Sequence, residues 1–452
     1  MEEDTGRKGP LLDLEKGLRC CGPNRTRSRS AFLDENLPRH RPDRHSLGPP
    51  LINWIIAGSF LLTGSESEWA ARLPSVVSLL ALCLAAFFVL RNHFGTRHAM
   101  FVTFVFLTAA SMIEKCRMAE IEAVFIALFG LACLSWISLW TSNRSPWLIW
   151  TIPYVFLGLG NLANGPVLLL FWCLFLLPIL RSARSTRDFF HPAHFLGLIL
   201  LFAIPLPWVF ANLSAAAQPD DSVGNWVNEI TKRADISTDA LKEWAMHPFE
   251  LLLNFLPWTI PLLFSLWCLR KTEKPTFPLS KWDAVTRGCA WCGLFSALAL
   301  LAIPGGLPRY FLPLYTPVAI AVIALYFRVG ESQRNAYERF SFYSLLVFVG
   351  IGFLAAIGGS FYAIQEGLSP LWAPISFGLL LLAGYLVWLL RKKTAPGVFY
   401  SAPILVAIVF FLLSSVAIPL ERQEYQWRKG AADLRELGNK AKGEKVFFAD
   451  DA

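Results

Sequence analysis

The segment Glu114–Glu122, EKCRMAEIE, places five charged side chains between two apolar runs, and Arg117, Glu120 and Glu122 are among them. An arginine at membrane depth costs about 2.5 to 3.5 kcal/mol on insertion scales, so it should face a bundle or a wet cavity and pair with a carboxylate. A carboxylate there can take a proton from an attacking hydroxyl group, and the guanidinium can neutralise an anion. The alternative is a set of helix-end charges that reach to the interface.

Arg309 and Tyr310 follow a Gly-Gly-Leu-Pro segment and precede another apolar run. A guanidinium beside a phenol at the bilayer edge suits a phosphate ester, because it donates two hydrogen bonds without losing its charge. Taken alone, the pair is also compatible with a simple interface anchor.

The segment Gly158–Pro166, GLGNLANGP, interrupts two apolar runs. Non-helical backbone at membrane depth is tolerated where it is buried in protein or lines a cavity, so Asn164 is a candidate binding residue. The alternative is a plain turn between two helices.

The stretch Gly48–Ser75 begins with a Pro pair and contains an apolar segment, Leu51–Gly64, that is too short to cross a bilayer. We expect this segment to lie along the membrane surface. Trp54 and Trp69 suit the boundary between headgroups and acyl chains, and Trp54 is a candidate contact for a substrate held there. The wet side is marked by Glu66, Glu68 and Arg72.

The composition is that of an integral membrane protein, because 55% of the 452 residues are hydrophobic and 16% are charged. The formal charge of +8 does not indicate nucleic acid, since the basic residues lie in short pieces between apolar runs. A pair of cysteines, Cys289 and Cys292, lies inside such a run without the partners that a zinc or redox site needs, and we interpret it as packing.

The apolar runs predict an all-α, polytopic transmembrane helical bundle with about twelve spans, surface-lying helices and a short soluble C-terminal segment. The runs are Leu73–Leu90, His98–Ile113, Ile121–Trp140, Pro146–Leu162, Pro166–Leu180, Phe195–Asn212, Leu251–Leu269, Ala284–Ile303, Tyr310–Phe327, Ser341–Ile364, Leu371–Leu390 and Val398–Leu420.

The charge of the loops predicts the topology and, with it, the division of the chain. Lys and Arg concentrate in one set of alternate loops, which the positive-inside rule places in the cytoplasm. The loop 213–250, the stretch 48–75 and the C-terminal tail are then outside. We expect a polar, disordered segment over 1–47, a membrane domain over 48–420, and over 421–452 the start of an extracytoplasmic soluble domain that the chain's end truncates.

Several motifs occur in a consistent order, namely PPLINW, SEWAARLPS, RMAEIE, LGLGNLANGP, a Pro-Trp pair, HPFELLLNFLPW and LPRYFLPLY. From Gly48 to Leu420 this order resembles the ArnT-like members of the polyprenyl-phosphate sugar glycosyltransferases. That group belongs to the membrane GT-C superfamily and includes the protein O-mannosyltransferases (glycosyltransferase families 39 and 83). The resemblance implies a GT-C-like fold in the cytoplasmic (inner) membrane.

The resemblance also implies an activity, the transfer of a hexosyl or pentosyl group from a polyprenyl-phosphate carrier to a lipid, glycan or protein acceptor outside the cytoplasmic membrane. Membrane lipids and the isoprenoid-phosphate sugar are the implied partners, and nucleic acid is not one. No cofactor is required by the sequence, while the metal requirement and the oligomeric state stay open.

In such enzymes an acidic residue acts as base or stabiliser and basic residues hold the carrier phosphate. Carried over, Arg117, Glu120 and Glu122 match the family's arginine and acidic positions at a helix end. Arg309 and Tyr310 match its late basic-aromatic pair.

Further candidates and departures concern single positions. His247, in the HPFELLLNFLPW motif, is a candidate for substrate binding. The family usually has Lys where this chain has Gly48 and Asn164. Members of the family begin with a membrane helix and a loop that carries the catalytic acid. Neither has a recognisable counterpart before residue 48 of this chain, and we expect the helix to be absent or replaced. Asp34 is the weak candidate for the acid.

Two other functions stay open. A catalytically impaired relative would explain the lost acid and lysines. A polytopic transporter of lipid or sugar would show internal repeats and paired broken helices, of which the sequence has one break and no convincing repeat.

Overall fold

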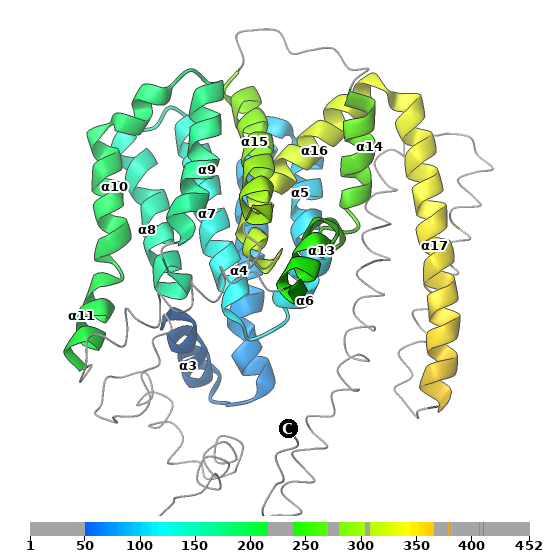
Figure 1. Ribbon diagram of the computed structural model, residues 1–452, viewed down its shortest axis with the longest axis horizontal. Helices are drawn as coiled ribbons and strands as arrows, with labels where there is room; N and C mark the ends of the chain where they lie inside the picture. The colour runs from blue at the N-terminus through cyan, green and yellow to red at the C-terminus, as the bar shows by residue number, and fades with distance from the viewer. Residues whose placement is uncertain are drawn as a thin grey trace, which may run out of the picture. The chain divides into compact units, whose positions relative to one another are not determined.

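The computed structural model describes residues 50–165, 167–215, 238–269, 280–302 and 308–365, and a few single positions beyond them. All regular structure in these ranges is helical (Figure 1), which confirms the predicted all-α membrane bundle. Predictions for Asp34, Gly48 and residues 1–47, for the two spans after residue 370, and for the segment 421–452 lie outside the described residues.

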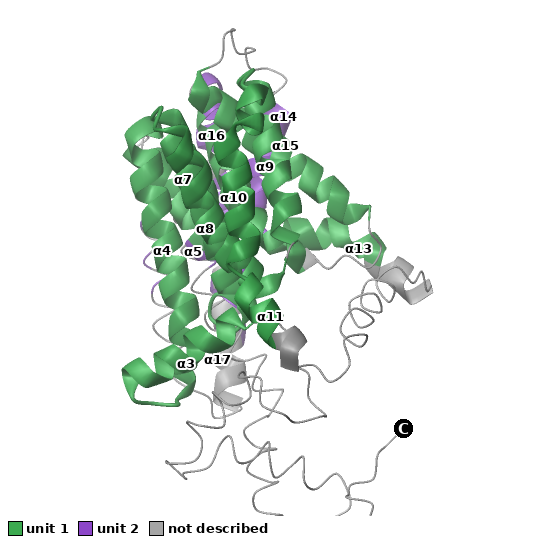
Figure 2. Cartoon of the chain, turned by 90° about the vertical axis from the view of Figure 1, so that its left-hand side faces the viewer, with its two compact units in different colours: residues 1–106, 115–254, 273–327 green, residues 107–114, 255–272, 328–452 purple. Residues whose placement is uncertain are grey.

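The chain divides into two compact units (Figure 2). Unit 1 comprises residues 1–106, 115–254 and 273–327, and unit 2 comprises residues 107–114, 255–272 and 328–452. All candidate site residues that the structure describes belong to unit 1.

The centre of unit 1 is α7 (Ile121–Thr141), which packs against α4 (Glu68–Phe94) and α8 (Pro146–Asn164). Because α7 is apolar on all sides, it is suited to the inside of a bundle. In the 18-residue apolar stretch of α7, 72% is buried inside the protein, whereas in that of α4 the buried share is 33%. α4 therefore leaves an apolar face available for lipid. The aromatic side chains of Trp136 and Phe175 meet edge to face in this core.

Two further helix pairs belong to this bundle. α8 packs against α10 (Pro192–Ala203), and α9 (Val167–Ser182) packs against α15 (Lys281–Leu301). Small residues allow the backbones to approach closely, as is common between membrane helices. A Cβ atom on Gly197 would lie 2.4 Å from the carbonyl oxygen of Trp150.

The described residues contain six helices that are long and apolar enough to cross a membrane, or up to seven if the pair Trp244–Asn254 and Thr259–Cys268 counts as one span. The protein is therefore a multi-pass membrane protein, and the count of about twelve stays a prediction. One expected span, His98–Ile113, is divided into α5 (Thr96–Thr108) and α6 (Ala110–Lys115). The expected span Phe195–Asn212 corresponds to the candidate span Pro192–Ala211, in which α10 and α11 (Leu206–Ala215) are separated by a short break next to prolines that lack the helical N–H donor.

Two of the basic loops meet at one end of unit 1. The Nζ atom of Lys281, at the start of α15, donates hydrogen bonds to the carbonyl oxygen of Trp140 (2.8 Å) and to Oδ1 of Asn143 (2.7 Å). These two residues lie at the end of α7, next to Arg144. A cation is favourable at the C-terminal end of a helix, which suits Lys281 at this position. The hydrogen bonds join two loops that the positive-inside rule assigns to the cytoplasm.

A buried polar pair joins α8 to α10. Nδ1 of His194 lies 2.5 Å from the carbonyl oxygen of Phe189, so this nitrogen carries the proton. Nε2 is then an acceptor, and the hydroxyl group of Tyr154 donates to it at 2.5 Å. The ring of His194 also stacks on Trp150.

We expect Tyr154→Phe to lower the free energy of unfolding by about 1 to 3 kcal/mol, because it leaves Nε2 of the buried His194 without a donor. Thermal unfolding in detergent measures the effect. Tyr343→Phe, on α17 (Arg334–Gln365), is the control, because its side chain is 63% exposed. Equal Tm values for the two variants would contradict the prediction.

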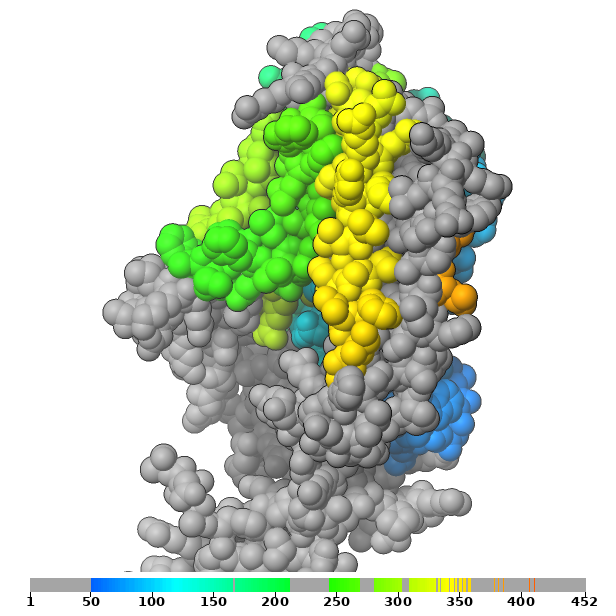
Figure 3. Space-filling view, turned by 90° about the vertical axis from the view of Figure 1, so that its right-hand side faces the viewer, coloured from blue at the N-terminus to red at the C-terminus, as the bar shows by residue number. Residues whose placement is uncertain are grey.

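Unit 2 has its own aromatic contacts, between α14 (Thr259–Leu269) and α17. The rings of Phe264 and Phe340 stack with centroids 3.8 Å apart, and the hydroxyl group of Tyr337 donates to Oγ of Ser265 at 2.6 Å. Figure 3 shows α17 in yellow along the surface. Its exposed side chains are apolar over several turns, as suits a lipid-facing helix, and they include Leu346, Val347, Ile351, Leu354 and Ile357.

Candidate functional site

The short helix α3 (Leu51–Thr63) begins directly after Pro50 and ends at Gly64, whose φ is 65°. Thirteen residues extend about 20 Å, less than the hydrocarbon core of a bilayer. Ile52 and Ile56 pack against Val124 of α7, which places α3 on the end of unit 1 where α7 begins. The prediction of a short helix unable to span is confirmed.

The outer face of α3 carries apolar side chains that the bundle does not cover. Trp54 is 42% exposed and Leu62 is 90% exposed. Exposed apolar side chains of this kind suit a lipid interface, and the contact expected of Trp54 stays a prediction.

The elbow after α3 leads directly into α4. Oγ of Ser59 donates to the carbonyl oxygen of Ala70 at 2.6 Å and ties the two helices together. On the exposed first turns of α4, Arg72 forms an ion pair with Glu68. An exposed pair of this kind contributes at most about 1 kcal/mol to stability, so it mainly keeps this surface polar.

The turn between α6 and α7 holds a second ion pair. Nζ of Lys115 lies 3.3 Å from Oε2 of Glu120, and the side chains are 18% and 35% exposed. Glu120 is the N-cap residue of α7 and Glu122 lies in its first turn, where the helix dipole favours negative charge. Arg117, in the middle of the turn, is half-buried, and its Nη1 atom is buried.

Lys115 is a site residue that sequence reasoning did not single out. It is the cation five positions before Glu120, at the end of α6, and the turn brings the two charges together. The cluster of charged residues at Glu114–Glu122 was a signal for the region, but nothing in it indicated which cation would pair with which carboxylate.

Cys116, in the same turn, is not suited to nucleophilic chemistry. Burial raises the pKa of its thiol to about 12, so the thiol stays protonated at neutral pH. The reactive groups of this turn are therefore its carboxylates and cations. Among the described ranges no group of three or more His, Cys, Asp or Glu side chains is arranged to hold a metal ion.

Arg309 and Tyr310 lie in the 3-10 helix η2 (Pro308–Leu314), which packs against α7. Arg309 is exposed, and its guanidinium carbon lies 5.8 Å from the ring centroid of Tyr310. This side chain is exposed, and its role in binding an anion stays a prediction.

His247 lies in α13 (Thr238–Asn254), a helix that also contacts η2. Its side chain is 5% exposed, and Nδ1 is buried without a hydrogen-bond partner in the described part of the chain. The indole N–H of Trp244 donates to the carbonyl oxygen of Leu301 at 2.7 Å and fixes α13 to the end of α15. α13 thus holds an imidazole nitrogen available for a hydrogen bond in the part of unit 1 that contains η2.

Asn164 is the last residue of α8 and is exposed. Gly165 follows with a φ of 80°, and α9 begins at Val167. Residues 158–164 are therefore helical, and the chain leaves α8 at Gly165, which agrees with the second alternative, a turn between two helices. Because α8 returns alongside α7 and contacts α3, Asn164 lies at the end of unit 1 where α7 begins (Figure 1).

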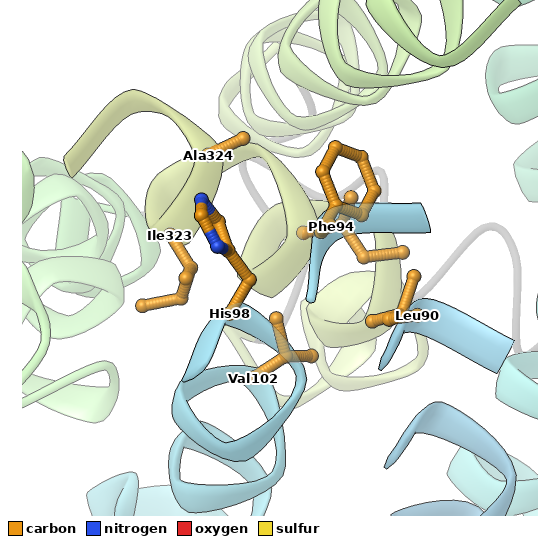
Figure 4. A pocket seen from close by; sticks show the side chains of 7 residues that line it. Leu90, Phe94, His98, Val102, Ile323 and Ala324 are labelled. Atoms are coloured by element: carbon orange, nitrogen blue, oxygen red, sulfur yellow. The ribbon is translucent and has the colours of Figure 1, made fainter. Parts of the chain in front are cut away.

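An apolar cavity between α4, α5 and α16 (Tyr315–Ser332) is not part of this site (Figure 4). Leu90, Phe94 and His98 contribute to its lining. Leu90 lies fifteen residues after Ser75 on α4, so the cavity is more than about 20 Å along the helix from the turn with Glu120.

Comparison with known proteins relates the chain to one group of enzymes. The family model for dolichyl-phosphate-mannose-protein mannosyltransferase matches residues 47–210, which include α3, the Lys115–Glu120 pair and Asn164. The undecaprenyl phosphate-alpha-4-amino-4-deoxy-L-arabinose arabinosyl transferase 2 of Proteus mirabilis is 24% identical over 376 residues, 78% of this chain and 64% of the relative. A transferase of the same kind from Edwardsiella ictaluri is 26% identical over 305 residues, 65% of this chain and 51% of the relative.

The chain thus spans 64% and 51% of the lengths of these two relatives. Among solved structures it is similar to ArnT from Cupriavidus metallidurans in the apo state, with a TM-score of 0.60, 17% identity and coverage of 89% of this chain and 76% of that one. ArnT from the same organism bound to undecaprenyl phosphate gives a TM-score of 0.59, 16% identity and the same coverage. The chain therefore has the fold of ArnT and resembles, over most of its length, the ArnT-like polyprenyl-phosphate sugar glycosyltransferases of the GT-C superfamily.

Proposed function

We propose that the chain is a glycosyltransferase that passes a sugar from a polyprenyl-phosphate carrier to an acceptor at the outer face of the cytoplasmic membrane. The observation that carries the proposal is the Lys115–Glu120 ion pair at the start of α7, beside the surface helix α3. It places an acid and a cation together at a bilayer edge. The names of the curated relatives and of the undecaprenyl-phosphate complex support a carrier of this type.

The proposed reaction uses the carboxylate of Glu120 as base, with Glu122 as the alternative. An acceptor hydroxyl group attacks the anomeric carbon and loses its proton to the carboxylate, while the bond between that carbon and the phosphate oxygen breaks. The phosphate leaves with the electron pair, and Lys115 and Arg117 stabilise its charge. In the free protein Lys115 is paired with Glu120, so arrival of the phosphate would draw the ammonium group away and free the base.

Arg309, Tyr310 and His247 are proposed to complete the binding site from η2 and α13. Arg309 suits a second contact to the phosphate, because a guanidinium group can donate two parallel hydrogen bonds to two phosphate oxygens. The buried imidazole of His247 suits a hydrogen bond to a sugar hydroxyl group or the phosphate. Trp54 and Asn164, on α3 and at the end of α8, suit contacts with the isoprenoid chain and with the headgroup region.

The surroundings of the site define the rest of the proposal. We place the protein in the cytoplasmic (inner) membrane, with the basic loops inside and α3 outside. Membrane lipids and the isoprenoid-phosphate sugar are its partners. We propose residues 48–420 as the transferase domain, preceded by the segment 1–47 and followed by an extracytoplasmic segment over 421–452.

Transfer can be tested with the full chain in proteoliposomes. The donors are undecaprenyl phosphate carrying a radiolabelled aminopentose or a radiolabelled hexose, and the acceptors are a lipid extract and a peptide mixture. We expect label to move from one donor to an acceptor, with release of undecaprenyl phosphate. Movement of uncleaved donor across the bilayer would overturn the proposal in favour of a transporter, and donor binding without turnover would overturn it in favour of an impaired relative.

A further inference from the structure

The hydroxyl group of Ser75 makes a contact over a long sequence separation with the turn that carries the proposed reactive residues. Its Oγ atom donates to the carbonyl oxygen of Met118 at 2.6 Å, and the two residues are 43 positions apart. Ser75 itself is fully buried in α4. A short hydrogen bond from a buried hydroxyl group restrains the position of a backbone carbonyl group more than a contact between surface side chains does.

Met118 lies in the same turn as the charged residues of the site, so a bond to its carbonyl oxygen can fix their positions. The N–H of Met118 donates to the carbonyl oxygen of Lys115 at 3.3 Å, so Lys115 and Met118 belong to one tight turn. Arg117 precedes Met118 directly, and Glu120 follows two positions later. Moving the Met118 carbonyl therefore moves both partners of the Lys115–Glu120 pair.

The first turns of α4, which carry Ser75, are also tied to α3. The hydroxyl group of Ser59 ties α3 to Ala70. Ala71 of α4 and Ile121, the first residue of α7, both pack against the buried cluster of Ile52, Ile56 and Val124. The result is a continuous set of contacts from α3, through the start of α4, to the start of α7. Within it, the Ser75–Met118 bond joins α4 to the turn before α7.

We infer that Ser75 is a positioning residue for the proposed transfer, fixing the turn so that Lys115, Arg117 and Glu120 present their charges in one geometry. The inference rests on the proposed function. Ser75 does not touch the substrate in this scheme and acts through the Met118 carbonyl. A small displacement of reacting groups is enough for a large loss of rate.

The structure offers a matched control in Ser59. Its hydroxyl group also donates to a backbone carbonyl at 2.6 Å, it is also buried, and it lies in α3, which it joins to the start of α4. Its bond does not reach the turn with Lys115. Ser59→Ala and Ser75→Ala therefore remove the same kind of bond from the same part of the fold, and only the second one frees the turn.

The test compares wild type, Ser75→Ala, Ser75→Thr and Ser59→Ala as full chains in proteoliposomes. We expect similar Tm values for the two alanine variants. For Ser75→Ala we expect a fall in kcat of about tenfold with KM for the donor little changed, since misplacement affects the reacting geometry more than carrier binding. Ser75→Thr keeps the hydroxyl group and should recover most of the rate, and Ser59→Ala should stay within about twofold of wild type.

A second readout does not depend on activity. Hydrogen exchange of the peptide spanning Cys116–Glu120 should be faster in Ser75→Ala and unchanged in Ser59→Ala. Unchanged exchange in Ser75→Ala, or equal losses of kcat in the two alanine variants, would overturn the inference. A wild-type chain that shows no transfer would count against the proposed function, whereas the exchange result would still decide whether Ser75 holds the turn.

Discussion

Replacing Glu120 with Gln is expected to lower sugar transfer by about 10² to 10⁴-fold, the usual contribution of a general base. The amide keeps the size of the side chain and can still accept a hydrogen bond from Lys115, but it cannot take the proton of the acceptor hydroxyl group. Single-turnover release of undecaprenyl phosphate in proteoliposomes measures the rate, and donor binding measured separately should change far less.

Glu68→Gln is the matched control, because it also removes the carboxylate of an ion pair near the same end of unit 1. Its rate should stay within about twofold of wild type, since an exposed pair contributes little. If Glu122→Gln abolished transfer and Glu120→Gln did not, the base would be Glu122 and the assignment of Glu120 would be wrong.

The coupling of Lys115 to Glu120 can be measured in the same assay. If the two side chains act as a unit, the double variant Lys115→Met, Glu120→Gln should lose no more rate than the more severe single variant. Fully multiplicative losses would show that the ion pair has no part in the reaction.

The second large effect is expected in the fold itself, at Gly288 of α15. A Cβ atom there would lie 2.5 Å from Cα and 2.7 Å from the backbone nitrogen of Ile179 on α9. Because the obstacle is backbone, a small side-chain adjustment cannot remove it. We expect Gly288→Ala to separate α9 from α15 and to lower the free energy of unfolding by about 1 to 3 kcal/mol, and Gly288→Leu to prevent folding.

Thermal unfolding of purified protein in detergent measures the alanine variant, and the yield of monodisperse protein measures the leucine variant. Gly58→Ala on α3 is the control, because nothing lies within 4 Å of its added Cβ atom. That change should be neutral or stabilise by up to about 1 kcal/mol through helix propensity. A Gly288→Ala protein with a wild-type Tm would show that α9 and α15 do not pack as described.

Much of the architecture follows from local composition, for a physical reason. Each membrane helix must satisfy its own backbone hydrogen bonds, and the bilayer sets its length, so an apolar run indicates a helix wherever it occurs. This is why α4, α7, α8 and α15 fall where the apolar runs predict them, and why Leu51–Gly64 was predicted to be too short to span. The order of weak motifs likewise indicated the fold that the comparison with ArnT confirms.

Other features depended on contacts that composition does not describe. The break between α5 and α6 lies inside a uniformly apolar run, and the N–H of Ala110, at the start of α6, donates to the carbonyl oxygen of Leu256, far along the chain. The segment Gly158–Pro166 was compatible with a broken membrane segment until the structure showed a turn at Gly165. Local sequence permitted both outcomes in each case.

In the candidate site, too, some features were predictable from local sequence and others depended on tertiary contacts. Residue types and spacing by themselves predicted a charged segment at a membrane edge, and the structure places that segment in the turn before α7. Only the tertiary structure decided that Lys115 is the partner of Glu120 and that Ser75 holds Met118 from 43 residues away. Partition into a bilayer is a property of each segment alone, whereas the choice of partner for a charge or a hydroxyl group depends on which helix ends the packing brings together.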